Sequence, residues 1–84
     1  MEDDIHHRVL RVICEILERE ADEIPLHASL RNNLQVDSLQ QMTIFIGLED
    51  EFQRVIPLEQ VMKLDTIKDI IEFVHEKLQE PFPT

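Results

Sequence analysis

Apolar residues spaced three and four positions apart dominate this chain and restrict it to a helical fold. In residues 4–20 the apolar stripe consists of Ile5, Val9, Val12, Ile13, Ile16 and Leu17. This spacing places side chains on one face of an α-helix. The same period recurs in residues 38–52 and 65–80, and no segment shows the alternation of a half-buried strand. The pattern predicts three longer helices, the first capped by Asp3 or Asp4.

The segment between the first two helices loses this period without becoming a polar linker. Residues 22–36 include loop-forming residues such as Pro25 and Asn33. They also include five apolar residues: Ile24, Leu26, Leu30, Leu34 and Val36. A loop of this length in a small domain is usually functional or packed against the core. We therefore expect Leu26, Leu30 and Leu34 to insert into the bundle.

Start and stop signals define the remaining helices. Pro57 suits the first position of a short helix in residues 57–64, because a missing N–H costs nothing there. Thr66 followed by Asp69 is a start signal for the last helix. Prolines end that helix and leave residues 81–84 as a frayed tail. The sequence predicts an all-α fold: a small four-helix bundle with three longer helices, one short helix and a long loop between the first two, forming one domain over residues 1–84.

The second helix, residues 38–52, has the broadest apolar face. We expect that face to contain Leu39, Met42, Phe45, Ile46, Leu48 and Phe52. Gly47 in its middle costs roughly 1 kcal/mol relative to alanine. A glycine there would allow a neighbouring helix to approach closely, leave room in the core, or simply be tolerated.

Charge indicates which partners the chain would attract. Eighteen acidic and eight basic residues give a formal net charge of −10. Such a surface repels nucleic acid and anionic membranes and attracts proteins with basic patches. The start, "MEDDIHHR", is acidic and does not resemble a signal peptide, and no apolar run is long enough to span a membrane. We expect a cytoplasmic monomer.

The residues that usually support catalysis or metal binding are few. Gly47 is the only glycine, so no glycine-rich phosphate loop is present, and Cys14 is the only cysteine. The four histidines, at positions 6, 7, 27 and 75, do not have the spacing of zinc ligands. We therefore predict neither a metal site nor an enzyme.

The start of the second helix offers one candidate site. Asp37 suits the N-cap, and Gln40 completes the spacing of a capping box. Ser38 would then place a hydroxyl in the first turn, where free N–H groups and the helix dipole favour negative charge by ~0.3–1 kcal/mol. The position suits a phosphate-linked group, although Asp-Ser is also a common capping sequence.

The order of motifs along nearly the whole chain resembles the acyl carrier protein family, including the peptidyl carriers. The sequence runs from "LRNNLQVDSL" through "LEDEF" and "VIPLEQV" to "TIKDIIEFV". The matching residues are Leu30, Leu34, Asp37, Ser38, Leu39, Leu48, Glu49, Glu51, Phe52, Ile56, Pro57, Thr66, Ile67 and Ile71.

The resemblance implies a carrier function without catalysis. In that family a phosphopantetheinyl transferase that uses magnesium attaches 4′-phosphopantetheine from coenzyme A to the serine of the D-S-L motif, here Ser38. The thiol of the arm holds acyl groups as thioesters for acyl-transferring and synthase enzymes with basic patches, in fatty acid, polyketide or related biosynthesis. Acyl chains are sheltered between the helices, and the residues expected to line that space are Phe45, Ile46, Val61, Met62 and Ile67.

The chain departs from the family pattern around the serine. Gln35 stands where the family usually has glycine, which predicts a different loop backbone. Gln40 and Thr43 replace the acidic residues of typical fatty-acid carriers. We expect partners to contact Gln40, Thr43, Glu49, Asp50, Glu51 and Glu59. The reduced charge beside the serine indicates a specialised carrier whose partners differ from those of housekeeping fatty-acid synthesis.

Two other functions fit parts of the sequence. An acidic helical interaction module without a prosthetic group would show the same charge and the same helices. A small enzyme ranks third, because a Ser-His-Asp set can be assembled on paper but has no supporting spacing. The cargo, which could be fatty acyl, polyketide or aminoacyl, is left open.

Overall fold

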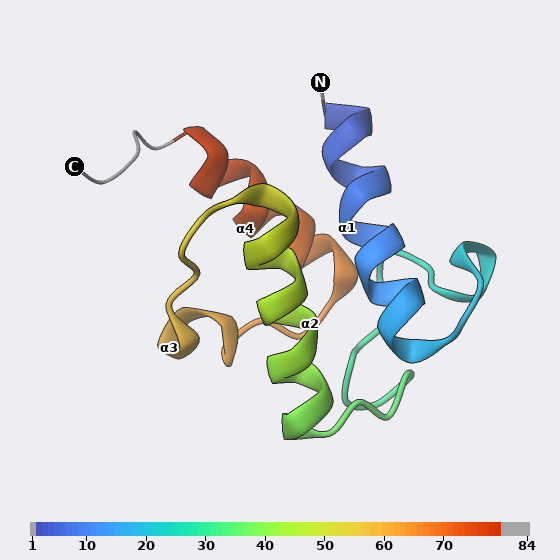
Figure 1. The fold of residues 1–84 in the computed structure, drawn as a ribbon. Coiled ribbons are helices and arrows are strands. Elements are labelled where there is room, and N and C mark those ends of the chain that lie inside the picture. The colour runs from blue at the N-terminus through green and yellow to red at the C-terminus, as the bar shows by residue number, and fades with distance from the viewer. Residues whose placement is uncertain (1, 80–84) are drawn as a thin grey trace.

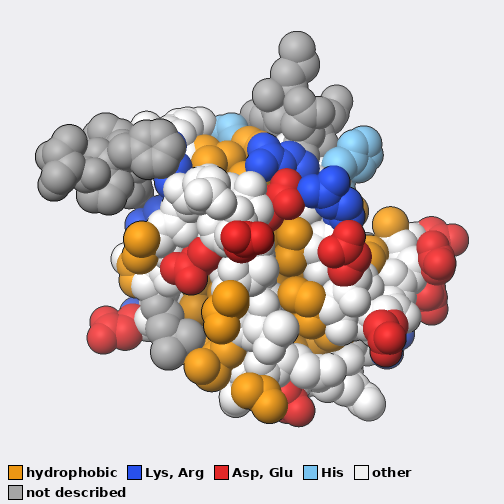
Figure 2. Space-filling model, viewed as in Figure 1, with side chains coloured by type: hydrophobic (Ala, Val, Ile, Leu, Met, Phe, Trp, Pro, Cys, Tyr) orange, Lys and Arg blue, Asp and Glu red, His pale blue; other side chains and the backbone are white. Residues whose placement is uncertain are grey.

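Four α-helices and a long loop make up the fold (Figure 1). The computed structural model describes residues 2–79, with only the backbone at positions 2–4 and 58. Its elements are α1 (Glu2–Leu17), the 3-10 turn η1 (Ala21–Glu23), α2 (Ser38–Phe52), α3 (Leu58–Val61) and α4 (Ile67–Gln79). Within residues 2–79 there is no β-strand, so the predicted all-α bundle with one short helix is confirmed. Figure 2, in the same view as Figure 1, shows acidic side chains spread over the face of the molecule that is turned to the viewer.

The first helix differs from its predicted limits at both ends. It begins at Glu2, so Asp3 and Asp4 lie inside its first turn and the predicted cap at these positions is wrong. It ends at Leu17 rather than near residue 20, because Glu18 has a left-handed φ of 57°. The N–H of Arg19 then donates to the carbonyl of Cys14 at 3.1 Å and closes the helix end. At 16 residues, α1 is the longest helix described, and no helix in the described residues could cross a membrane.

The starts of α3 and α4 are fixed by different groups. Pro57 precedes α3 by one residue, so its predicted place inside the helix is wrong; its carbonyl instead accepts the N–H of Val61 at 3.2 Å. At α4, the hydroxyl of Thr66 accepts the N–H of Asp69 at 3.1 Å, which confirms the predicted start signal. The predicted tail, residues 81–84, lies outside the described residues.

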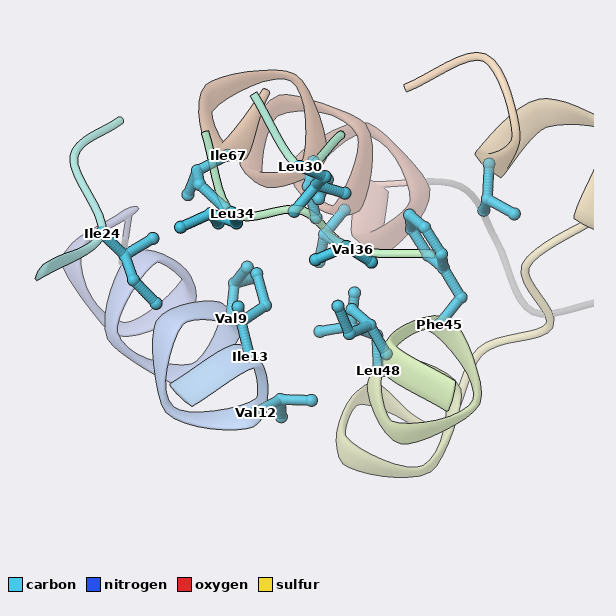
Figure 3. Packing of buried hydrophobic residues seen from close by; sticks show 14 of the residues in the cluster. Val9, Val12, Ile13, Ile24, Leu30, Leu34, Val36, Phe45, Leu48 and Ile67 are labelled. Atoms are coloured by element: carbon cyan, nitrogen blue, oxygen red, sulfur yellow. The ribbon is translucent and has the colours of Figure 1, made fainter. Parts of the chain in front are cut away.

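One hydrophobic core joins the three longer helices and the loop (Figure 3). The loop between α1 and α2 also contributes side chains to this core, since Leu30 is fully buried and Leu34 nearly so. Leu26 is 37% exposed, so its predicted insertion is wrong. At Leu26 the backbone faces α4, where its carbonyl accepts the N–H of Lys68 at 2.9 Å. The core residues of the helices are Val9, Val12, Ile13, Ile44, Phe45, Leu48, Phe52, Val61, Ile67, Ile70 and Val74.

Hydrogen bonds attach the loop to the start of α4. The N–H of Leu30 donates to the carbonyl of Asp65 at 2.8 Å, and the N–H of Ile67 donates to the carbonyl of Ala28 at 3.3 Å. The buried hydroxyl of Ser29 donates to a carboxylate oxygen of Asp65 at 2.6 Å. The bond from Ile67, like the bond from Lys68 to Leu26, pairs an N–H group at the start of α4 that has no acceptor within the helix. The loop is therefore a fixed element that delivers the chain to the start of α2.

Gly47 marks the point where α1 and α2 approach each other. A Cβ atom at this position would lie 3.0 Å from Val12 Cγ1 and 3.3 Å from Ile16 Cδ1. Both distances are shorter than ordinary carbon contacts of about 3.5–4.0 Å. Of the three roles considered for this glycine, the structure supports the close helix approach.

Candidate functional site

Ser38 is the first residue of α2, and its side chain is exposed. The loop reaches it through Val36, which is buried, and Asp37, which is exposed. The hydroxyl therefore lies where the first-turn N–H groups of a 15-residue helix point outward. This is the placement that the sequence predicted for it.

Asp37 and Gln40 form a reciprocal capping box around Ser38. The carboxylate of Asp37 accepts the N–H of Gln40 at 2.8 Å, and the side-chain carbonyl of Gln40 accepts the N–H of Asp37 at 3.3 Å. The backbone of Asp37 is extended, with φ −86° and ψ 176°, as an N-cap residue requires. Both predicted capping roles are confirmed. The box holds the helix start rigid without using the serine hydroxyl.

Removing this cap has a measurable cost. We expect Asp37→Ala to lower the free energy of unfolding by about 0.5–2 kcal/mol, because the N–H of Gln40 loses the carboxylate that accepts it. Urea denaturation followed by circular dichroism measures this loss. Asp50→Ala removes one exposed carboxylate from the same helix without touching the cap, and serves as the control. Equal stabilities of the two variants would show that the Asp37 carboxylate does not hold the helix start.

The loop backbone just before the cap is left-handed at Gln35. Its φ is 54°, a region that glycine favours. Gln35 thus has the backbone conformation that a glycine would adopt most readily. The two residues that flank Gln35, Leu34 and Val36, are buried. The N–H of Val36 also donates to the carbonyl of Leu30 at 2.7 Å. These flanking contacts hold Gln35 in a conformation that costs a non-glycine residue roughly 1–2 kcal/mol.

Glycine at position 35 should relieve this strain. We expect Gln35→Gly to raise the free energy of unfolding by about 0.5–1 kcal/mol, since the relief exceeds the extra flexibility of glycine in the unfolded chain. Thermal and urea unfolding both measure it. Gln35→Ala keeps the Cβ atom and should bring no gain. If the glycine variant were no more stable than the alanine variant, the backbone of Gln35 would not be strained.

The buried side of α2 faces the other helices and includes a polar residue. Ile44, Phe45, Leu48 and Phe52 are buried there together with Gln41, whose amide nitrogen lies 3.4 Å from the carbonyl of Val61 and 3.3 Å from that of Leu64. Gln41 thus pairs backbone carbonyls at the end of α3. Sequence reasoning missed this role, although position 41 is three residues before Ile44 and seven before Leu48, which is the spacing of one helix face.

The opposite side of α2 is apolar as well, and it is exposed. Leu39, Met42 and Ile46 are 72%, 39% and 62% exposed, so the broad apolar face predicted for this helix is only partly buried. Because α2 has apolar residues on both sides, its core contacts decide which set is buried. Ile46 points away from the interior and cannot line a space between helices, which corrects its predicted role. Of the other predicted lining residues, Phe45, Val61 and Ile67 are buried and Met62 is half-buried.

The residues expected to contact partners fall into two groups. Gln40, Thr43, Asp50 and Glu59 are exposed. Glu49 and Glu51 are half-buried and have bonds within the fold. The carboxylate of Glu49 accepts the N–H of Ile56 at 2.6 Å, which fixes the chain after α2.

Glu51 connects α2 to α1 through two arginines. Its carboxylate oxygens lie 2.7 Å from Arg8 Nε and 2.8 Å from Arg11 Nη2. The hydrogen bond from Arg8, aided by Arg11, lowers the pKa of Glu51 and keeps it ionised. The guanidinium of Arg8 also lies 4.4 Å from the ring centroid of Phe52. Much of the charge of Glu51 is therefore compensated by α1.

Comparison with known proteins places this arrangement in a family. A family whose sequence model is described as "Phosphopantetheine attachment site" matches residues 7–74, which covers α2, the loop and most of α1 and α4. The chain belongs to this family. It is also 29% identical over 76 residues to an acyl carrier protein of Porphyromonas gingivalis, covering 90% of this chain and 97% of that protein. An acyl carrier protein of Thermosynechococcus vestitus is 29% identical over 75 residues, covering 89% and 93%.

Membership of this family confirms the resemblance to acyl carrier proteins and the general function that the resemblance implied. The protein is a carrier rather than an enzyme, and its cofactor is covalently attached 4′-phosphopantetheine. The structure fits such a group at the start of α2. There an exposed hydroxyl stands beside outward-pointing N–H groups, and the neighbouring carboxylate of Asp37 is already bonded to Gln40.

Proposed function

We propose that Ser38 carries the 4′-phosphopantetheine arm and that the protein delivers acyl groups held on it to partner enzymes. The observation that carries this proposal is a contrast between the two serines of the sequence. Ser29 is buried, and its hydroxyl is bonded to Asp65 at 2.6 Å. Ser38 is exposed at the first turn of α2. Only Ser38 can meet a transferase without unfolding the loop.

The attachment step requires little of the carrier itself. The Ser38 oxygen forms a bond to phosphorus, the phosphoanhydride bond of coenzyme A breaks, adenosine 3′,5′-bisphosphate leaves with the bonding electrons, and the hydroxyl proton passes to solvent. A separate transferase with magnesium performs this chemistry. The product is a phosphodiester with one negative charge, which the N–H groups and dipole of α2 favour. The cap at Asp37 keeps those groups in place.

The carrier role follows from a tether on a rigid body. When bound, the arm supplies a terminal thiol that holds an acyl group as a thioester. A flexible tether anchored at Ser38 raises the effective concentration of the cargo at each partner. The rigid cap and the packed loop fix the direction from which the tether leaves the protein. The pathway we propose is fatty acid, polyketide or related biosynthesis, with Phe45, Val61, Met62 and Ile67 as the residues that shelter an acyl chain.

Arm attachment can be tested directly. The purified protein is incubated with coenzyme A, magnesium and a broad-specificity phosphopantetheinyl transferase. We expect the intact mass to rise by one phosphopantetheine and peptide mapping to place the gain on the peptide that contains Ser38. An unchanged mass with several active transferases would favour an acidic interaction module without a prosthetic group.

A further inference from the structure

Gln41 is the only polar residue among the buried residues of α2, and just 2% of its surface is exposed. We propose that Gln41 makes the carrier select acyl groups that have a second oxygen close to the thioester, such as 3-oxoacyl groups, over saturated acyl groups of the same length. The inference rests on the proposed function of Ser38 and names the chemical class of its cargo.

Gln41 lies between the attachment residue and the residues proposed to shelter an acyl chain. It follows Ser38 by three positions and precedes Phe45 by four, so both residues are its neighbours along α2. Its amide nitrogen lies 3.4 Å from the carbonyl of Val61, at the end of α3, the short helix beside α2 (Figure 1). Phe45 and Val61 are both buried and belong to the proposed acyl site. An acyl chain that runs from the arm to these residues must therefore pass the amide of Gln41.

The amide of Gln41 joins α2 to the end of α3 through two long hydrogen bonds. Its nitrogen carries two N–H groups and faces two backbone carbonyls, that of Val61 at 3.4 Å and that of Leu64 at 3.3 Å. Both distances exceed the range of about 2.7–3.2 Å that is usual for N–H···O bonds, so each bond is weak. An acceptor that comes closer to the amide nitrogen can replace either carbonyl.

The chemistry of the entering chain decides how much this displacement costs. A chain that enters beside Val61 separates Gln41 from the two carbonyls and leaves two buried N–H groups to be paired. A buried donor that loses its acceptor costs more free energy than an average hydrogen bond contributes. The thioester oxygen, which every acyl cargo has, accepts one of the two N–H groups. A saturated chain has no acceptor for the other, whereas the ketone oxygen of a 3-oxoacyl chain accepts it.

Two cargoes of equal length test this selection. Octanoyl and 3-oxooctanoyl groups are loaded from their coenzyme A thioesters by a broad-specificity transferase, and intact mass verifies each product. A sheltered chain stabilises the folded state, because it has no such contacts in the unfolded chain. The Tm of each loaded protein is therefore compared with that of the protein carrying the bare arm. We expect 3-oxooctanoyl to raise the Tm by about 4–8 °C more than octanoyl does, which is the effect of one hydrogen bond in a domain of this size.

Matched variants show whether Gln41 causes the difference between the cargoes. Gln41→Met keeps a side chain of similar length that has no N–H group, and Gln60→Met makes the same replacement at an exposed position on α3. Each Tm shift is taken relative to the same variant with the bare arm. We expect the difference to disappear in Gln41→Met and to persist in Gln60→Met. If Gln41 acted only on stability, every Tm of its variant would fall and the difference would remain, which would overturn the proposal.

The wild-type comparison decides the proposal even if Gln41→Met does not fold. Equal Tm shifts for the two cargoes, or a larger shift for octanoyl, would overturn the selection by Gln41 and leave Ser38 as the attachment residue. A wild type that gains no mass with either coenzyme A thioester would instead overturn the assignment of Ser38, and the selection with it.

Discussion

Replacing Ser38 by alanine is expected to abolish attachment of the arm and leave the fold intact. The exposed hydroxyl is the only group at the start of α2 that can form the phosphodiester, and its loss removes no core contact. Intact-mass measurement after incubation with coenzyme A and a transferase should show no gain for the variant. Its free energy of unfolding, measured with urea, should match that of the wild type within about 0.5 kcal/mol, as for most surface substitutions.

Ser29→Ala is the matched control for this experiment. It removes the only other serine hydroxyl, which is buried and bonded to Asp65. We expect it to gain the arm as the wild type does while losing about 1–3 kcal/mol of stability, because a partner of the Asp65 carboxylate is removed. If Ser38→Ala still gained the arm, or if Ser29→Ala did not, the assignment of the attachment residue would be wrong.

Leu30→Ala is expected to cost about 2–5 kcal/mol of stability, a large share of the 5–15 kcal/mol typical of small domains. Leu30 is fully buried in the core beside Val36 and Ile67 (Figure 3). Its backbone also links the loop to Asp65 and Val36 through hydrogen bonds of 2.8 and 2.7 Å. An alanine there leaves a cavity at the point where the loop is attached to the bundle. Thermal and urea unfolding should both show the loss.

Leu26→Ala provides the comparison within the same loop. Leu26 is also a leucine and lies only four positions before Leu30. It is partly exposed, however, and contacts α4 through its backbone. We expect its replacement to change stability by about 0.5 kcal/mol or less. Similar losses at both positions would mean that the loop is not held by the burial of Leu30.

The start of α2 could be predicted from the sequence because its causes are local. The cap, the capping box and the exposed serine involve only Asp37, Ser38 and Gln40, and helix-start chemistry operates within four residues. The start of α4 at Thr66 was predictable for the same reason. The all-α fold followed from a helical period in three separate segments.

The tertiary structure decided what depends on distant neighbours. Periodicity identifies the buried side of a helix only when one side is apolar, and α2 is apolar on both sides. Its contacts with α1 and α3 decided that Gln41 is buried and Ile46 is exposed. In the loop, packing placed Leu30 rather than Leu26 in the core, although the backbones of both residues are hydrogen-bonded to residues 65–68. By itself, the sequence therefore determined where α2 and α4 begin and which serine stands at a helix start. Which apolar side chains meet solvent beside that serine was decided by packing, because burial depends on contacts between residues far apart in the chain.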